Sequence, residues 1–216
     1  MATDGDSDAR LCWRCEARAG SALVCPQCAT PQPVPAGTDL FAALDLPRRL
    51  VVDGDDLERR WHDASRALHP DRHQTAEARA QELSVAASAA INRAYRTLRD
   101  PVARGRYWLE LHGDALGTRN NQVPPALAAF VFETQEELDA LREEPTDAAV
   151  RARVDGVRRD IAARVASLVA GVTSRYADWD RADAGSASVL AELKATLSEI
   201  AYLETLLEDV ETALGD

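Results

Sequence analysis

Residues 57–72 read Leu57-Glu58-Arg59-Arg60-Trp61-His62-Asp63-Ala64-Ser65-Arg66-Ala67-Leu68-His69-Pro70-Asp71-Arg72. Apolar side chains recur in this stretch at steps of four, three and four residues, which is the spacing of one buried helix face. They are Leu57, Trp61, Ala64 and Leu68. Asp55 or Asp56 can cap the start of this helix, and Pro70 ends it. The stretch therefore predicts an amphipathic helix followed by a loop that carries His69-Pro70-Asp71.

Further helices are predicted on both sides of this loop. Residues 39–44 form a short turn of helix that Pro47 closes, and residues 76–99 form a long alanine-rich helix. Asp100-Pro101 supplies a capping residue and a proline at the first helical position, and this helix ends at Gly113. We predict that residues 38–117 form one domain of four short helices, with the tripeptide at the tip of a helical hairpin.

The last part of the chain, residues 118–216, is predicted to hold three helices. Pro124-Pro125 opens the first of these and Pro145 closes it. Two long stripes of valine, isoleucine and leucine follow at helical spacing, over residues 150–172 and 193–214, with Gly185 in the turn between them. Two such stripes favour an antiparallel pair with the first helix laid across it. We expect an all-α protein.

Charge is spread unevenly along the chain and limits the classes of function. The net charge is −11, and residues 118–216 alone hold 10 basic and 19 acidic side chains. Nucleic-acid binding needs clustered Lys and Arg, so this acidic part argues against a nucleic-acid ligand. No glycine-rich phosphate loop is visible and nothing arranges Ser, His and Asp as a hydrolase triad, so we expect neither ATP binding nor hydrolase chemistry of that kind. No apolar run is long enough to span a membrane and no secretory signal is visible, which predicts a cytoplasmic protein.

All four cysteines lie in residues 1–37, as the pairs Cys12-x-x-Cys15 and Cys25-x-x-Cys28. Each pair can present two thiolates to one ion, and two pairs complete a tetrahedral site of four sulfurs. A segment this small has almost no core, so it needs such a cross-link. We predict one structural Zn²⁺ with no open coordination position, followed by a proline-rich linker over residues 30–37.

Other readings of the cysteine pairs remain open. Two disulfides are disfavoured without an export signal, and a single redox-active C-x-x-C is weakly supported, because there are two pairs and no β-α-β context. A rubredoxin-like iron centre is chemically possible, because the same four ligands bind iron. A zinc ribbon that binds nucleic acid is disfavoured by the nearly neutral charge of residues 1–37.

The predicted arrangement of a short helix, a helical hairpin and His69-Pro70-Asp71 at its tip resembles a J-domain. The short helix lies in the stretch Asp39-Leu40-Phe41-Ala42-Ala43-Leu44-Asp45-Leu46-Pro47. The resemblance implies that the loop and a basic second helix bind a heat-shock chaperone ATPase of the DnaK/HscA type and accelerate its hydrolysis. Proline gives the loop a fixed backbone, and the aspartate can form a charge-assisted pair with an arginine of the partner. The implied chaperone contacts are His69, Pro70, Asp71, Arg59, Arg60, Arg66 and Arg72.

Two further stretches, residues 90–101 and 104–113, resemble the HscB family, the J-domain co-chaperones of iron–sulfur cluster assembly. The cysteine pairs resemble the N-terminal zinc module of its eukaryotic-type members. The resemblance implies that the chain is a co-chaperone rather than an enzyme, and that its C-terminal helices bind a scaffold protein of the IscU type. Phe130, Val131 and Phe132 are consecutive apolar residues, which cannot share one helix face, so at least one of them is expected to be exposed. The implied scaffold contacts are Phe130, Val131, Phe132, Glu133, Glu136, Glu137 and Tyr202.

Two alternative functions stay open. A general protein-folding J-protein would share the loop but carry another client, and a four-cysteine electron carrier would hold iron instead of zinc. We expect a monomer or a weak dimer.

Overall fold

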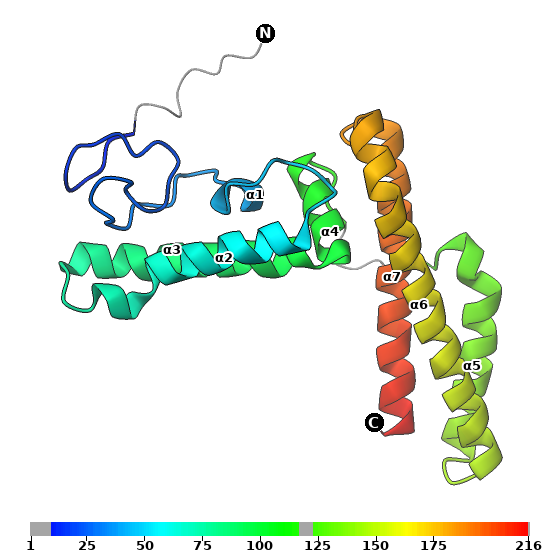
Figure 1. Cartoon of the computed structure of the whole chain (residues 1–216). Coiled ribbons are helices and arrows are strands. Elements are labelled where there is room, and N and C mark those ends of the chain that lie inside the picture. Colours follow the sequence, from blue (N-terminus) through cyan, green and yellow to red (C-terminus); the bar gives the residue numbers. More distant parts are fainter. Residues whose placement is uncertain (1–9, 117–122, 216) are drawn as a thin grey trace. The chain divides into compact units, whose positions relative to one another are not determined.

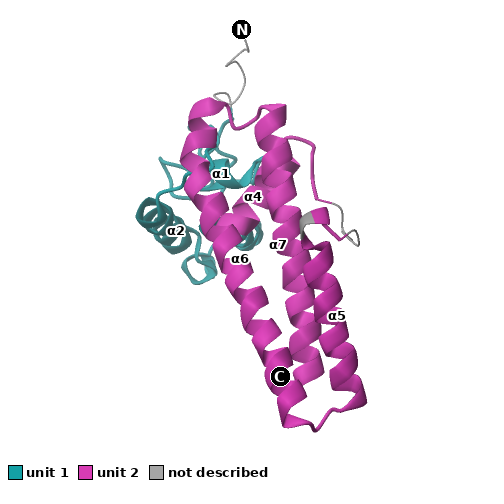
Figure 2. Cartoon of the chain, turned by 90° about the vertical axis from the view of Figure 1, so that its right-hand side faces the viewer, with its two compact units in different colours: residues 1–100 teal, residues 101–216 magenta. Residues whose placement is uncertain are grey.

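The computed structural model describes residues 10–116 and 123–215, except for the side chain of Ala126. Over these residues the chain forms seven α-helices and no strand, and its only β-type pairings are two isolated bridges in the cysteine segment. The predicted all-α fold is confirmed. Two compact units divide the chain, residues 1–100 (unit 1) and residues 101–216 (unit 2), and they are coloured separately in Figure 2.

Unit 1 contains a helical hairpin with a short helix packed on it (Figure 1). Its elements are α1 (Leu40–Ala43), α2 (Gly54–Leu68), the 3-10 turn η1 (Pro70–His73) and α3 (Ala78–Arg99). The cap of α2 is Asp53 rather than the predicted Asp55 or Asp56, because its side chain accepts hydrogen bonds from the amides of both. Asp39 caps α1 in the same way through Ala42 N.

The contact between α2 and α3 follows the predicted apolar stripe with local changes. Leu57 and Leu68 are fully buried, whereas Trp61 is half-buried and stacks on Tyr95, with ring centroids 4.4 Å apart. Ser84 takes a core position on α3 because its hydroxyl donates to the carbonyl of Leu68 at 2.7 Å. That bond satisfies a carbonyl at the end of α2, and it fixes the last turn before the His69-Pro70-Asp71 loop against α3.

Unit 2 is a three-helix bundle with a fourth, shorter helix packed on it. Its elements are α4 (Pro101–Leu111), the 3-10 turn η2 (Pro125–Leu127), α5 (Ala128–Glu143), α6 (Ala148–Ala182) and α7 (Ala187–Leu214). α6 and α7 form the predicted antiparallel hairpin, and α5 packs along both (Figure 2). The turn lies where Gly185 predicted it, but the left-handed residue is Asp183, with φ 85°. None of the described helices combines the length and the apolarity needed to cross a membrane.

Helix α4 belongs to unit 2 by its contacts, although the sequence placed it in a domain over residues 38–117. Trp108 Nε1 donates to the carbonyl of Ala184 at 2.8 Å, and Arg106 pairs with Glu204 at 2.9 Å. The indole of Trp108 is buried, so its N–H needs a partner, and the α6–α7 turn provides one. The three-part division of the chain stays a prediction, and its boundary between residues 117 and 118 lies outside the described residues.

At Gly105, α4 packs closely against α6 and α7, and replacing this residue by Ala is expected to destabilise the fold. A Cβ there would lie 2.6 Å from Tyr176 Oη and 3.1 Å from Leu197 Cδ1. The Tyr176 ring is buried and its hydroxyl donates to the Pro101 carbonyl, so it has little room to move. Overpacking of this kind costs about 1–3 kcal/mol.

The matched control is Gly156→Ala in the middle of α6, where no heavy atom lies within 4 Å of the added Cβ. That change should raise the free energy of unfolding by about 0.5–1 kcal/mol, because alanine favours helix more than glycine does. Chemical denaturation of both variants measures the difference, and shifts of the same sign would contradict the tight approach of α4.

Candidate functional site

The four cysteines converge on one point, as their spacing predicted. The sulfurs of Cys12 and Cys28 are 3.7 Å apart, as are those of Cys15 and Cys25. All four lie within 4.8 Å of one another. Tetrahedral zinc with Zn–S bonds of about 2.3 Å requires sulfurs about 3.8 Å apart. The residues present therefore fit a single four-coordinate metal ion.

Each cysteine pair lies in a turn of the same design, which we call the first knuckle (residues 11–18) and the second knuckle (residues 24–31). In the first, Cys12 N donates to Ala17 O at 2.8 Å and Glu16 N donates to Cys12 O at 3.0 Å. The second knuckle repeats both bonds at the same spacings: Cys25 N donates to Thr30 O, and Ala29 N donates to Cys25 O. Glu16 and Ala29 both have positive φ, of 59° and 55°. The repeated geometry aims two thiols from each turn at the same point.

Hydrogen bonds around the sulfurs favour thiolates at two of the four cysteines. Hydrogen bonds from Thr30, side chain and backbone, lower the pKa of Cys28 to about 6. Burial alone would raise the pKa of Cys12, but backbone hydrogen bonds from Cys15 and Arg14 outweigh it and lower the pKa. Thiolates are the form of cysteine that binds metal, so both are prepared as ligands.

Cys15 differs from these two. A backbone hydrogen bond from Ala17 acts to lower the pKa of its thiol, but side-chain hydrogen bonding with Cys28 and burial outweigh it and raise the pKa to about 12. A metal ion would displace that proton on binding, because the thiolate is the ligand.

Several residues of the cysteine site were not predicted. Thr30, Pro31 and Gln32, expected in a linker, are buried instead. They form the extended segment that ends the second knuckle and continues just past it, where Pro31 bridges to Val24. Gln32 Nε2 lies 3.2 Å from Cys12 Sγ, so this side chain supports a ligand directly. Arg10 donates to the carbonyls of Pro33 and Ala22 and thereby ties both ends of the segment together. Prolines rule out helix here, but they are compatible with an extended arm.

The His69-Pro70-Asp71 loop lies at the tip of the α2–α3 hairpin and faces solvent. His69 is the C-cap of α2, and its Nδ1 accepts a hydrogen bond from Asp71 N at 3.3 Å. Gln74 Nε2 donates to one carboxylate oxygen of Asp71 at 3.1 Å. The side chains of His69 and Asp71 remain 58% and 72% exposed. The loop therefore holds its polar groups in a fixed shape and presents them outward.

The arginines predicted to make α2 basic have acidic neighbours, and Arg59 and Arg66 are exposed whereas Arg60 is half-buried. Arg59 pairs with Asp56, Arg66 pairs with Asp63, and Arg60 pairs with both Asp56 and Asp45. The hydrogen bond to Asp56 raises the pKa of Arg60 further. Over Gly54–Leu68 three arginines face four acidic residues, so α2 is not positive overall. Its guanidinium groups offer directed hydrogen bonds more than a long-range positive field.

Arg72, just past the loop, differs from these three. Its guanidinium donates to the carbonyl of Arg66 at 3.1 Å and so lies back along the end of α2. This bond keeps the Arg72 guanidinium close to the last turn of α2.

The seven predicted scaffold contacts do not share one surface. Phe132 is 65% exposed, and Glu133 and Glu136 are exposed beside it on α5. Val131 lies in the core of the bundle with an exposure of 8%, so only its neighbours face solvent. The remaining three side chains are partly covered. The Arg164 guanidinium lies over the Phe130 ring, and Glu137 pairs with Arg153. Tyr202 packs against the core of the bundle. We call Phe132, Glu133 and Glu136 the α5 patch.

No protein-family model matches the chain. A protein of Bordetella petrii named "Co-chaperone protein HscB homolog" is 34% identical over 145 residues, which cover 67% of this chain and 84% of that protein. The protein of the same name from Bordetella pertussis is 35% identical over 136 residues, 62% of this chain and 80% of that one.

Two solved structures resemble the fold over most of the chain. The crystal structure of human co-chaperone protein HscB aligns with a TM-score of 0.73 at 24% identity, over 94% of this chain and 98% of that one. Chaperone HscB from Vibrio cholerae aligns with a TM-score of 0.56 at 26% identity, over 82% and 99%. The Bordetella relatives at 34% and 35% identity confirm the predicted family, and both solved structures agree with it in fold: the chain belongs to the HscB co-chaperones.

Proposed function

We propose that this chain stimulates the ATPase of a DnaK/HscA-type chaperone and delivers to it an IscU-type scaffold protein, for iron–sulfur cluster assembly and transfer. The observation that carries the proposal is the exposed, rigidly held His69-Pro70-Asp71 turn at the tip of a hairpin in a member of the HscB family. Hydrolysis takes place in the partner, and His69 serves here as a structural cap rather than as an acid or base.

The loop holds one exposed carboxylate in a fixed direction. Pro70 restricts the backbone, Gln74 donates to Oδ1 of Asp71, and Oδ2 lies 3.6 Å from His69 Nδ1. Because this side chain stays 72% exposed, an arginine of the chaperone can still pair with it. Arg59, Arg66 and Arg72 lie on the same hairpin and extend the surface along α2. Their acidic neighbours limit the electrostatic attraction, so the proposed contact depends on matched pairs at close range.

We propose that the cysteine site holds one Zn²⁺ with a structural role. The sulfur spacing and the two thiolate-favouring positions support a four-thiolate site. When bound, the ion cross-links the two knuckles, and with four protein ligands it offers no open position for catalysis. Iron in the same ligands is the rival, and the visible absorbance of a ferric four-sulfur centre distinguishes it from colourless zinc.

The α5 patch is proposed as the centre of the scaffold contact, so Phe132→Ala should weaken scaffold binding. Aromatic residues such as Phe are enriched in protein interfaces, and truncating one that is central to a contact costs more than about 1 kcal/mol, or about fivefold in Kd. Because Phe132 is 65% exposed, the fold should remain intact. Calorimetric titration with the scaffold measures the change.

Val85→Ala is the matched control, because Val85 is also an exposed apolar residue, at 58%, but lies on α3. Equal affinities for the wild type and Phe132→Ala would remove the α5 patch from the proposal.

A pull-down with the immobilised chain separates this function from that of a general folding J-protein. We expect both the chaperone and the iron–sulfur scaffold among the bound proteins. Recovery of unfolded chains without the scaffold would favour the general J-protein.

A further inference from the structure

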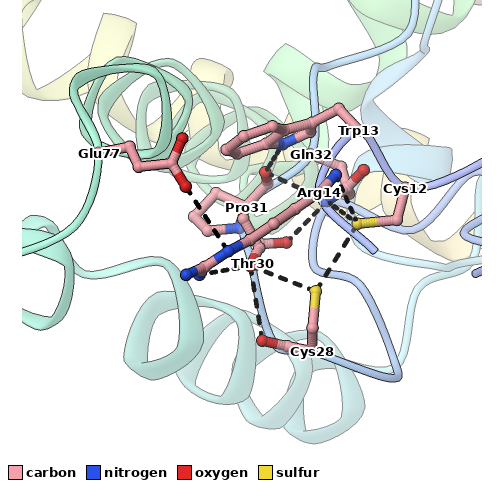
Figure 3. Close-up of polar contacts among 8 residues, drawn as sticks. All are labelled: Cys12, Trp13, Arg14, Cys28, Thr30, Pro31, Gln32 and Glu77. Carbon is pink, nitrogen blue, oxygen red and sulfur yellow. Dashed lines mark hydrogen bonds and ion pairs between the residues drawn. The ribbon is translucent and has the colours of Figure 1, made fainter. Parts of the chain in front are cut away.

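Two side chains of the first knuckle reach from the cysteine cluster to the start of α3. Trp13 and Arg14 stand between the ligands Cys12 and Cys15. The ion pair between Arg14 and Glu77 is drawn in Figure 3, and its Nε and Oε1 atoms are 3.7 Å apart. The guanidinium of Arg79 lies over the Trp13 ring, 4.7 Å from its centroid. The knuckle therefore contacts the segment that directly follows the His69-Pro70-Asp71 loop.

The orientation of both side chains depends on closure of the two knuckles. Trp13 Nε1 donates to Pro31 O at 2.8 Å, and Arg14 Nη1 donates to Thr30 Oγ1 at 3.3 Å. Thr30 Oγ1 in turn lies 3.2 Å from Cys28 Sγ (Figure 3). Since Thr30 and Pro31 belong to the second knuckle, a metal ion that joins the knuckles also fixes Trp13 and Arg14.

A second set of hydrogen bonds continues from α3 to the loop. Gln81 Nε2 donates to the carbonyls of Gln74 at 3.0 Å and Ala76 at 2.8 Å. Gln74 Nε2 donates to Asp71 Oδ1 at 3.1 Å. Glu77 occupies the N-cap position of α3 without making a capping bond, and its carboxylate points to Arg14 instead. Gln81 N donates to Glu77 O at 3.2 Å, and this backbone bond joins the two sets, so that contacts run from Cys28 Sγ to the carboxylate of Asp71.

We propose that Trp13 and Arg14 are positioning residues, which couple closure of the metal site to the shape of the His69-Pro70-Asp71 loop. This inference rests on the proposed function, because it assigns the cysteine module a part in activating the chaperone. Each contact is weak by itself, since the side chains of Arg14 and Glu77 are 52% and 60% exposed. The coupling therefore biases the loop toward one conformation and is expected to change affinity rather than act as an on–off switch.

Hydrogen exchange of the full-length, metal-loaded chain tests the coupling without any partner. In Trp13→Ala and Arg14→Glu, exchange at the amides of Arg72 and Ala76 should be about 3–10-fold faster, as expected when one or two weak contacts are lost. Both amides are hydrogen-bonded within the loop, to His69 O and His73 O. Core amides of α3 should exchange as in the wild type, and the metal content should be unchanged.

Two further variants separate coupling from a general loss of structure. Arg18→Ala alters an exposed arginine of the same knuckle whose side chain makes none of these contacts, so it should leave the loop unaffected. Reversing the pair in Arg14→Glu/Glu77→Arg should restore slow exchange. The same single variants should raise the concentration needed for half-maximal ATPase stimulation about threefold while retaining its maximum, as expected for a lost weak contact.

Unchanged loop exchange in both single variants and in the wild type after chelation would overturn the inference, even if the chain stimulates the chaperone well. Conversely, a wild-type chain that stimulates no ATPase would contradict the proposed function, while faster loop exchange in the variants would still support the coupling. The two failures are therefore distinguishable.

Discussion

Replacing Asp71 with Asn is expected to abolish ATPase stimulation while leaving the fold and scaffold binding intact. Asparagine has nearly the same shape and can keep the Oδ1 that accepts from Gln74, so the loop should retain its geometry. Only the negative charge is lost. Breaking a close charged pair across an interface costs about 2–5 kcal/mol, which lowers affinity by about 30-fold or more. With the carboxylate 72% exposed, its loss should barely affect stability.

Steady-state ATPase assays of the cognate chaperone measure this effect, with circular dichroism as the check on the fold. Glu82→Gln is the matched control, because it removes one exposed carboxylate from the same hairpin without touching the loop. If Asp71→Asn stimulates as well as the wild type does, the chain does not act as a J-protein.

Loss of the metal ion is the second large effect, and Cys25→Ser is expected to unfold the cysteine module. The buried apolar core of this module consists of Cys12, Ala19 and Cys25 alone, so the ligands themselves make up most of it. Structural zinc sites supply about 10–16 kcal/mol of apparent binding free energy in small modules, far more than such a core can replace. The helices of both units have their own cores and should persist.

Metal analysis and hydrogen exchange over residues 10–33 measure the loss. Leu11→Ser is the matched control, since Leu11 adjoins Cys12 but is 55% exposed and contributes no ligand. The wild type and this control should bind one zinc ion per chain and show no visible absorbance. A coloured, iron-containing wild type would support the electron-carrier alternative, and a rigid module in metal-free Cys25→Ser would contradict the structural role.

Helix positions were predictable because apolar spacing and proline positions act locally. The stripe on α2, the proline that ends it and the α6–α7 hairpin all follow from such patterns. The four-cysteine cluster was predictable for a different reason, because one ligand type at a fixed spacing leaves few geometries. Both depend on residues that are close in sequence.

Contacts between distant residues were not predictable in the same way. Ser84 is polar, and its sequence neighbours do not indicate burial. Its hydroxyl finds a partner in the core only because the end of α2 lies beside it. Nothing in the proline-rich run around Gln32 signals that its amide would reach Cys12 Sγ. Val131 and Phe132 are both apolar, and the side of α5 that packs against α6 decides which one is buried.

The basic face predicted for α2 came from its arginines alone, without the acidic residues beside them. Arg59 and Arg66 were assigned to the chaperone surface for their charge, but each has an aspartate three residues before it on the helix. Pairs at this spacing partly neutralise one another. Counting both signs along α2 would have given the observed balance from the sequence alone.

The most direct test of the account is the ATPase rate of the cognate chaperone, measured against the concentration of this chain with and without the iron–sulfur scaffold. We predict stimulation by the chain alone and a larger stimulation when the scaffold is present, because binding both partners on one chain raises their effective concentration. A chaperone whose ATPase rate is the same with and without the chain, in the presence of scaffold, would contradict it.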